Sequence, residues 1–186
     1  QVIFLDNHDM SRFFSVVNED VTKYRSALTW LLTSRGIPQI YYSDELATTG
    51  TTNPSDGYVR LACPGGFRGD KVNKFVRKGR TPKDDSIYQH IIKLANYRKS
   101  SSALTTGKFM QYVPDDGLYV YFRYDDKQTI MVVMNTAKKE KIIIPEKFSE
   151  RTNGFTKMKN IFTGKITPLK DFSMDAKESG VYELIK

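Results

Sequence analysis

A short apolar segment at the start of the chain runs directly into polar and titratable side chains. Residues 2–5 are all apolar, and Asp6, Asn7, His8 and Asp9 follow them without a break. Such a run is typical of a parallel β-strand buried on both faces, and residues that act on ligands gather where such strands end. The pattern predicts a strand whose carboxyl end lies at the rim of a functional site, in a chain that begins in the middle of a fold.

A helix and a second strand are predicted next. Apolar residues recur at spacings of three and four, at Val21, Tyr24, Leu28, Leu31 and Leu32. Residues 18–20 (Asn-Glu-Asp) supply a cap and favourable charge before them, and Gly36 is placed to end the helix. Pro38 can open the following strand, because a proline at a strand's first position removes little from the hydrogen-bond ladder. Together these elements predict a β-α-β unit.

A long loop and another helix follow. Residues 47–80 are rich in Gly and Pro and show little periodicity, which predicts an irregular loop. Loops of this length in compact domains are commonly functional. Residues 86–89 (Ser-Ile-Tyr-Gln) have the form of a capping box, and Ile87, Ile91 and Ala95 form an apolar face behind it. They predict a helix that begins there and runs to about Lys99.

Beyond three consecutive serines the apolar spacing changes to two. Strands are predicted at residues 108–113, 118–124, 129–135, 141–144 and 181–185. Residues 114–117 (Pro-Asp-Asp-Gly) and 125–128 (Asp-Asp-Lys-Gln) are hairpin turns by composition. The chain is therefore predicted to comprise an α/β part, residues 1–101, and an antiparallel β-sandwich, residues 102–186.

Composition and charge exclude several function classes. The chain carries 29 Lys and Arg against 21 Asp and Glu, a net charge of +8, but the basic residues are spread along it. Nucleic-acid binders concentrate them into a stripe or tail, so no nucleic-acid partner is expected. The chain has a single cysteine, Cys63, so no internal disulfide is expected. Its two histidines, His8 and His90, lie in unrelated contexts, so no structural metal site is expected either. No apolar run approaches the roughly 20 residues of a membrane span, so no membrane partner is expected.

Three ordered segments resemble the α-amylase superfamily, family 13 of the glycoside hydrolases. Phe4 with Asn7-His8-Asp9 is similar to the family's signature at the end of the seventh barrel strand. Residues 36–45 (Gly-Ile-Pro-Gln-Ile-Tyr-Tyr-Ser-Asp-Glu) resemble its eighth-strand motif, with Ser43 where Gly is usual. Residues 56–60 (Asp-Gly-Tyr-Val-Arg) and 64–70 (Pro-Gly-Gly-Phe-Arg-Gly-Asp) resemble the following loop in the neopullulanase and cyclomaltodextrinase branch. The resemblance thus covers the order of parts along the chain.

The resemblance implies roles for five side chains. Asp9 would be the family's third catalytic carboxylate, which grips sugar hydroxyls more tightly as the ring distorts, and His8 would donate to the same sugar. Tyr58 and Arg60 would contact substrate near the cleavage point, with loop stabilisation as the equal alternative. Asn7 would belong to the binding group as an orienter of the neighbouring loops. The alternative for residues 7–9 is a plain turn.

Other polar residues are expected to support the site. Glu45 is expected to be a buried structural partner at the end of the second strand, since a buried carboxylate must be paired. Arg12 is a candidate to pair with a nearby carboxylate, and Asp70 to accept backbone N–H bonds within the Gly-rich loop. That loop lacks the Gly-Lys-Ser/Thr ending of a phosphate loop, so nucleotide binding is excluded.

Length sets a further expectation. A complete eight-stranded barrel needs about 250 residues, whereas this chain has 186, enough for the last quarter of a (β/α)8 barrel and a β-sandwich. The family's nucleophilic Asp and acidic Glu lie on earlier strands, so the chain alone is expected to be inactive. Unpaired strand edges predict self-association, or a partner in the missing N-terminal part of the barrel. No cofactor is expected in this fragment, because the calcium of the complete enzymes draws on upstream segments.

The implied function is that of the C-terminal portion of a retaining α-glucan hydrolase of α-amylase, neopullulanase or cyclomaltodextrinase type. Its partners would be α-glucan oligosaccharides, and a periplasmic or secreted location is favoured over the cytoplasm. The rival is a non-catalytic carbohydrate-binding or interaction module that holds glycan through exposed aromatics of the β-sandwich. The candidates are Tyr112, Tyr119, Tyr121, Phe122 and Tyr124. Packing of these rings in the core is the favoured interpretation.

Overall fold

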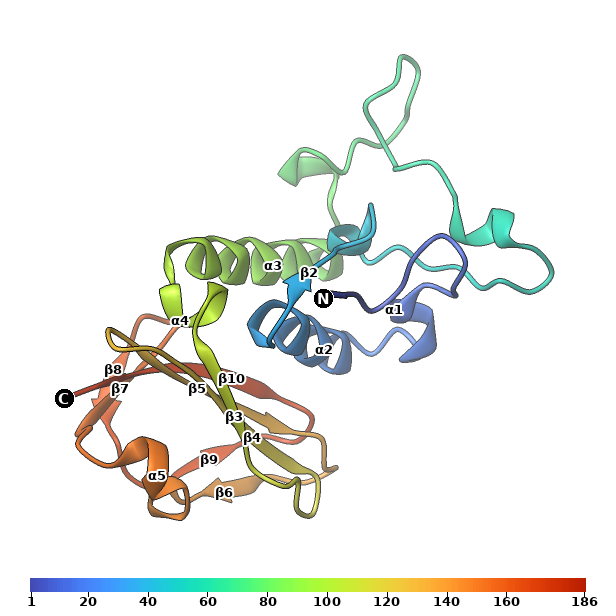
Figure 1. Cartoon of the computed structure of the whole chain (residues 1–186). Coiled ribbons are helices and arrows are strands. Elements are labelled where there is room, and N and C mark those ends of the chain that lie inside the picture. Colours follow the sequence, from blue (N-terminus) through green and yellow to red (C-terminus); the bar gives the residue numbers. More distant parts are fainter. The chain divides into compact units, whose positions relative to one another are not determined.

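The computed structural model describes all residues from 1 to 186, and the chain divides into two compact units (Figure 1). Unit 1 comprises residues 1–31 and 36–92, and unit 2 comprises residues 32–35 and 93–186. Two helices, α2 (Val21–Thr33) and α3 (Pro82–Ser100), therefore contribute to both units. None of the helices combines the length and the apolar character that crossing a membrane would need.

Unit 1 contains the predicted β-α-β unit. Strands β1 (Val2–Ile3) and β2 (Ile37–Pro38) pair in parallel, and α2 connects them after the short helix α1 (Phe13–Val16). Each strand is shorter than its apolar run, because each has a neighbour along one edge alone. Gly36 permits the close approach of the strands: its φ is +130°, and a Cβ there would lie 3.1 Å from the side chain of Ile3.

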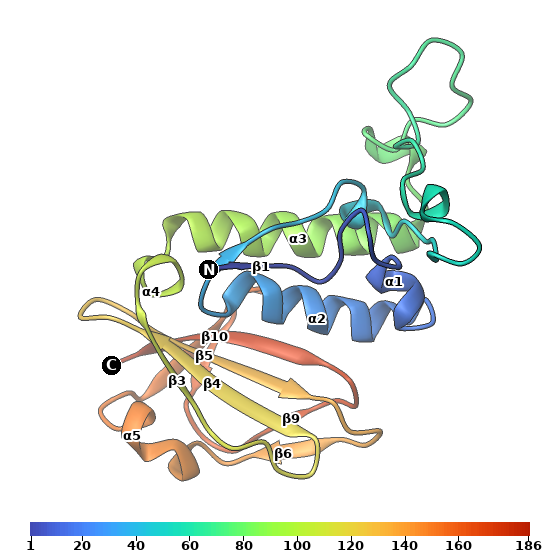
Figure 2. The ribbon, with the colours of Figure 1, turned by 45° about the vertical axis from the view of Figure 1, so that its right-hand side comes forward.

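The start of α2 follows the predicted capping pattern. Asp20 Oδ1 accepts hydrogen bonds from the backbone N–H groups of Thr22 and Lys23, each at 3.1 Å. The apolar stripe of the helix is buried together with residues from α1, α3 and the loops. This core comprises Phe14, Tyr24, Leu28, Leu31, Leu46, Val59 and Ile87. The two long helices lie side by side in both views (Figures 1 and 2).

The segment between β2 and α3 is the predicted long loop. It contains three 3-10 turns, η1 (Asp44–Leu46), η2 (Asp56–Val59) and η3 (Arg77–Gly79), and no strand. The part between η2 and η3 projects away from the helices (Figure 2). Loop geometry is held locally: Asp70 accepts the backbone N–H of Phe67 at 2.9 Å, which confirms the role predicted for Asp70.

Helix α3 begins four residues earlier than predicted. The capping box is formed by Thr81 and Asp84, not by residues 86–89: Asp84 accepts from the Thr81 backbone at 3.0 Å, and Thr81 Oγ1 accepts from the Asp84 backbone at 3.2 Å. Pro82 then occupies the first helical position, where its missing N–H costs nothing. The helix reaches Ser100, close to its predicted end.

Unit 2 is built on two antiparallel sheets. The larger has the order β3-β4-β5-β10-β7-β8, and the smaller pairs β6 with β9. The strands are β3 (Lys108–Gln111), β4 (Leu118–Tyr124), β5 (Thr129–Asn135), β6 (Lys141–Ile143), β7 (Lys157–Asn160), β8 (Ile166–Pro168), β9 (Phe172–Met174) and β10 (Ser179–Ile185). The short helices α4 (Ser102–Thr105) and α5 (Ser149–Thr152) and the 3-10 turn η4 (Pro145–Phe148) complete it.

The core of unit 2 lies between its sheets. Its members come from both sheets and from η4: Val120, Phe122, Met131, Val133, Ile143, Phe148, Met174 and Leu184. The opposite face of the large sheet is also covered, because Tyr121 is fully buried and its hydroxyl lies 2.5 Å from Thr33 Oγ1 at the end of α2. Arg123, buried beside it, donates to the carbonyls of Thr33 and Ser34 at 3.0 and 2.7 Å.

Candidate functional site

The residues that follow β1 form a tight turn that exposes two titratable side chains. Asn7 Oδ1 accepts the backbone N–H of Asp9 at 2.8 Å, a local bond that closes the turn, as the alternative of a plain turn also expects. His8 Nε2 lies 3.2 Å from Asp9 Oδ2, and both side chains are more than three-fifths exposed. Such a pair can meet a ligand without a conformational change.

Arg60 reaches this turn from the end of η2. Its Nε donates to the carbonyl of His8 at 2.9 Å, and its Nη2 donates to Asp9 Oδ1 at 3.0 Å. The same Nη2 lies 3.3 Å from Asp56 Oδ2. Arg60 therefore links two segments that are 51 residues apart in the sequence. The Arg60 guanidinium contacts one carboxylate oxygen of Asp9, and the His8 ring contacts the other.

Tyr58 belongs to the same turn, η2, but its ring is half exposed and forms no side-chain hydrogen bond with the other four predicted residues. Its carbonyl lies against Gly50, where a Cβ would come within 2.2 Å of that oxygen. The structure thus gathers Asn7, His8, Asp9 and Arg60, and places Tyr58 two residues before Arg60 with no hydrogen bond from its side chain to the four.

A buried charged cluster lies behind the exposed turn. Arg12 is fully buried, and its Nη1 lies 3.3 Å from Asp44 Oδ1. This ion pair confirms the predicted pairing of Arg12 with a carboxylate. The guanidinium also stacks on two rings of the segment after β2, at 4.0 Å from the centroid of Tyr41 and 4.7 Å from that of Tyr42.

Asp6 and Asp44 make this cluster sensitive to protonation. Burial, and after it the nearby charge of Asp6, raises the pKa of Asp44 to about 8, although Arg12 opposes the shift. Burial also raises the pKa of Asp6, against the hydrogen bond that the Phe13 backbone donates to it at 2.6 Å. Near neutral pH Asp44 is therefore the group that retains a proton, with Arg12 as the nearby positive charge.

The prediction that Glu45 is the buried, paired carboxylate after the second strand is wrong, because the adjacent residue holds that position. Glu45 is half-buried and forms no ion pair, whereas the adjacent Asp44 is buried and paired. The reason is local: Ser43 adopts a left-handed conformation, with φ at +65°, and the backbone N–H of Tyr41 donates to Asp44 Oδ2 at 3.1 Å. Ser43 stands where the resembled motif usually has Gly, a residue that adopts this conformation without strain.

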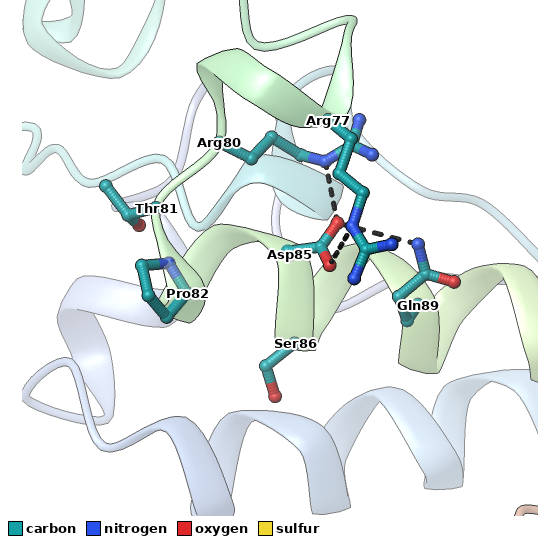
Figure 3. Close-up of a pocket in the computed structure, with 7 residues that line it drawn as sticks. All are labelled: Arg77, Arg80, Thr81, Pro82, Asp85, Ser86 and Gln89. Atoms are coloured by element: carbon teal, nitrogen blue, oxygen red, sulfur yellow. Dashed lines mark hydrogen bonds and ion pairs between the residues drawn. The ribbon is translucent and has the colours of Figure 1, made fainter.

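A shallow depression lies at the start of α3 (Figure 3). Arg77, Arg80 and Gln89 converge there on Asp85, with Arg80 Nε 3.0 Å and Arg77 Nε 3.3 Å from its carboxylate oxygens. Arg80 also lies 3.8 Å from the ring centroid of Tyr88. Two arginines thus share one carboxylate, Arg80 also donates to the carbonyls of Lys74 and Phe75, and none of the predicted site residues lines the depression.

Four of the five candidate aromatic residues of the β-sandwich are buried or pack against its core. Tyr121 and Phe122 are fully buried, and Tyr112 and Tyr124 pack against the core between the sheets. Tyr119 is the exception: it is half-exposed, its ring is tilted beside that of Tyr121 at 5.2 Å between centroids, and its hydroxyl donates to Gln111. The other four rings confirm the core interpretation, so they give no support to the rival carbohydrate-binding module. No three His, Cys, Asp or Glu side chains are arranged to hold a metal ion.

Comparisons with known proteins give two families. Residues 1–78 match the catalytic domain of alpha amylase, and residues 109–183 match the cyclo-malto-dextrinase C-terminal domain. The chain is 36% identical over 135 residues to a cyclomaltodextrin glucanotransferase of Geobacillus stearothermophilus, covering 73% of this chain and 16% of that protein. It is 34% identical over 135 residues to an alpha-amylase of Niallia circulans, covering 73% of this chain and 22% of that protein. The chain thus spans about a fifth or less of these relatives.

Solved structures share the fold over the whole chain. The alpha-amylase from Geobacillus thermoleovorans, complexed with acarbose, matches with a TM-score of 0.75 at 21% identity, over 100% of this chain and 39% of that one. The trehalose-6-phosphate hydrolase of Bacillus licheniformis matches with a TM-score of 0.75 at 20% identity, over 100% of this chain and 43% of that one. At this identity the likeness concerns the fold.

Proposed function

Because the chain belongs to the α-amylase family, with the end of a (β/α)8 catalytic barrel followed by an antiparallel β-sandwich, we propose that it carries part of the sugar site of an α-glucan-active enzyme. The observation that supports this proposal is the exposed group of His8, Asp9 and Arg60 at the end of β1. The catalytic pair itself is proposed to lie in a preceding part of the whole protein.

The chemistry of this group suits a sugar. An ionised carboxylate offers about four acceptor positions, and Arg60 and His8 occupy one on each oxygen of Asp9, so others remain for hydroxyl groups. Glycoside hydrolysis passes through an oxocarbenium-like transition state, in which hydrogen bonds to ring hydroxyls strengthen. Asp9 would therefore lower the barrier by binding the distorted sugar more tightly than the ground state.

In the whole protein the reaction is proposed to be hydrolysis of α-1,4 glucosidic bonds with retention of configuration, with α-1,6 bonds as a second substrate class. Retention requires a nucleophilic carboxylate and a carboxylic acid about 5 Å apart on either side of the bond. We assign neither role to Asp6 or Asp44, because both are buried beside Arg12. The 186-residue chain alone is therefore proposed to be inactive.

The test compares two carboxylates that contact the same arginine. In the whole protein, Asp9→Asn should lower kcat/KM on maltoheptaose by about 100-fold or more, as expected for loss of a charge that acts on the transition state. Asp56→Asn, which removes the other carboxylate beside Arg60, is the matched control and should retain activity within about fivefold. Equal activity of the two variants would contradict the role of Asp9.

A further inference from the structure

Arg12 connects the predicted sugar-binding turn with the segment that carries Arg60. It lies three residues after Asp9, and its backbone N–H donates to the carbonyl of Gly50 at 2.9 Å. Its Nη1 donates to the carbonyl of Tyr42 at 2.7 Å, and its Nε donates to the carbonyl of Val59 at 2.9 Å. One side chain thus bonds the segment after β2 and the end of η2.

The bond to Val59 and the bonds of Arg60 join the same two segments. Val59 precedes Arg60, whose own side chain bonds His8 and Asp9. The Arg12 bond is buried, whereas the Arg60 side chain is 45% exposed and that of Asp9 is 63% exposed. Exposed ion pairs alone hold a geometry weakly, because water screens the charges and two long side chains must be ordered. Buried, charge-assisted bonds are the stronger connection.

From these contacts we propose that Arg12 is a positioning residue that sets Arg60 against Asp9 by anchoring the carbonyl of Val59. The inference deepens the proposed function, because it concerns how that sugar site is held. Arginine is needed for this task, since its planar fork bonds Val59, Tyr42 and Asp44 while its faces stack on the two tyrosine rings. A lysine would keep the charge and lose the fork.

The test uses the 186-residue chain and a readout that requires no sugar. We would measure by NMR the solvent-exchange rate of the Arg60 Nε–H, which donates to the His8 carbonyl. In Arg12→Lys this rate should rise at least tenfold. The matched control is Arg80→Lys, because Arg80 is likewise stacked on a tyrosine and paired with an aspartate in the same unit. In this control the Arg60 rate should change less than twofold.

An unchanged Arg60 rate in folded Arg12→Lys, or an equal rise in Arg80→Lys, would overturn the inference. If Arg12→Lys does not fold, as judged by its amide spectrum, Tyr41→Leu replaces it, because that change removes the ring stacked on Arg12 and leaves the hydrogen bonds of Arg12 in place. The Arg60 rate should then rise at least threefold, and an unchanged rate would overturn the inference. Loss of the Arg60 contact with full glucan hydrolysis by the whole protein would instead contradict the proposed function.

Discussion

Asp44 makes the stability of unit 1 depend on pH. In an unfolded chain its pKa is about 3.9, whereas in the folded protein burial and the neighbouring Asp6 raise the pKa. Between these values the folded state holds a proton that the unfolded state releases, so the free energy of unfolding falls as pH rises. This loss begins above about pH 4 and is complete above the folded pKa of Asp44.

Asp44→Asn should remove that pH dependence, because the carboxamide stays neutral and can still accept from Arg12 as Asp44 does. With about 1.4 kcal/mol for each pKa unit and a rise of about 4 units, we expect the variant to be more stable than the parent by roughly 5 kcal/mol at pH 9 and similar to it at pH 4. Urea unfolding at both pH values measures this. Parallel pH profiles of parent and variant would show that Asp44 does not carry the effect.

Asp84→Asn is the control with the opposite sign. Burial raises the pKa of Asp84, but the hydrogen bonds from Lys74 and Thr81 lower that pKa further, so that it lies below its ordinary value. The stability that Asp84 contributes is present above its unfolded pKa and is lost as pH falls through the lower folded pKa. Asp84→Asn should therefore lower stability equally at pH 6 and pH 9, in contrast to Asp44→Asn.

At the residue scale, the motifs predicted which exposed side chains lie together better than which buried carboxylate lies behind them, and the sugar-binding role of the exposed group stays a prediction. The contacts of Asn7, His8, Asp9 and Arg60 agree with the grouping that the motifs predict. The buried partner was assigned to Glu45 instead of Asp44, because which of two adjacent carboxyl groups turns inward depends on the left-handed conformation of Ser43. That conformation is rare for serine, and no residue pattern specifies it.

At the element scale, Thr81 tests where α3 begins. Thr81→Ala removes the oxygen that accepts the Asp84 backbone N–H, and loss of such a cap costs about 1 kcal/mol. Ser86→Ala changes a residue inside the helix, where alanine is the better helix former, and should be neutral or slightly stabilising. Thermal unfolding of the two variants measures the difference. A larger loss for Ser86→Ala would place the cap at the later position.

The strands that the sequence pattern did not predict are short. Strands β8 and β9 have three residues each, too few for an alternating pattern to emerge, and β7 carries lysines at two of its four positions. Two of them also pair with strands that are not adjacent in the chain, β7 with β10 and β9 with β6, whereas β8 pairs only with the preceding β7. The long strands β4 and β5 were predicted with their observed bounds, because seven residues suffice to show their apolar character.

At the scale of the whole molecule, neither compact unit is one continuous stretch of the chain. Residues 32–35, at the end of α2, belong to unit 2, where their carbonyls accept hydrogen bonds from Arg98 and Arg123. Contacts between residues about 90 positions apart cannot be read from local patterns. The predicted boundary between residues 101 and 102 stays a prediction, as does self-association through the unpaired edges of β1 and β2.

The central claim is that this chain holds one part of a sugar site whose catalytic pair lies elsewhere in the whole protein. The most direct test measures reducing-sugar release from cyclodextrin, pullulan and maltoheptaose by the purified 186-residue chain, side by side with a protein extended upstream to a full barrel. We predict no release by the chain alone and clear release by the extended protein. Release by the 186-residue chain alone would contradict the claim, because the nucleophile and the acid would then have to be among its own residues.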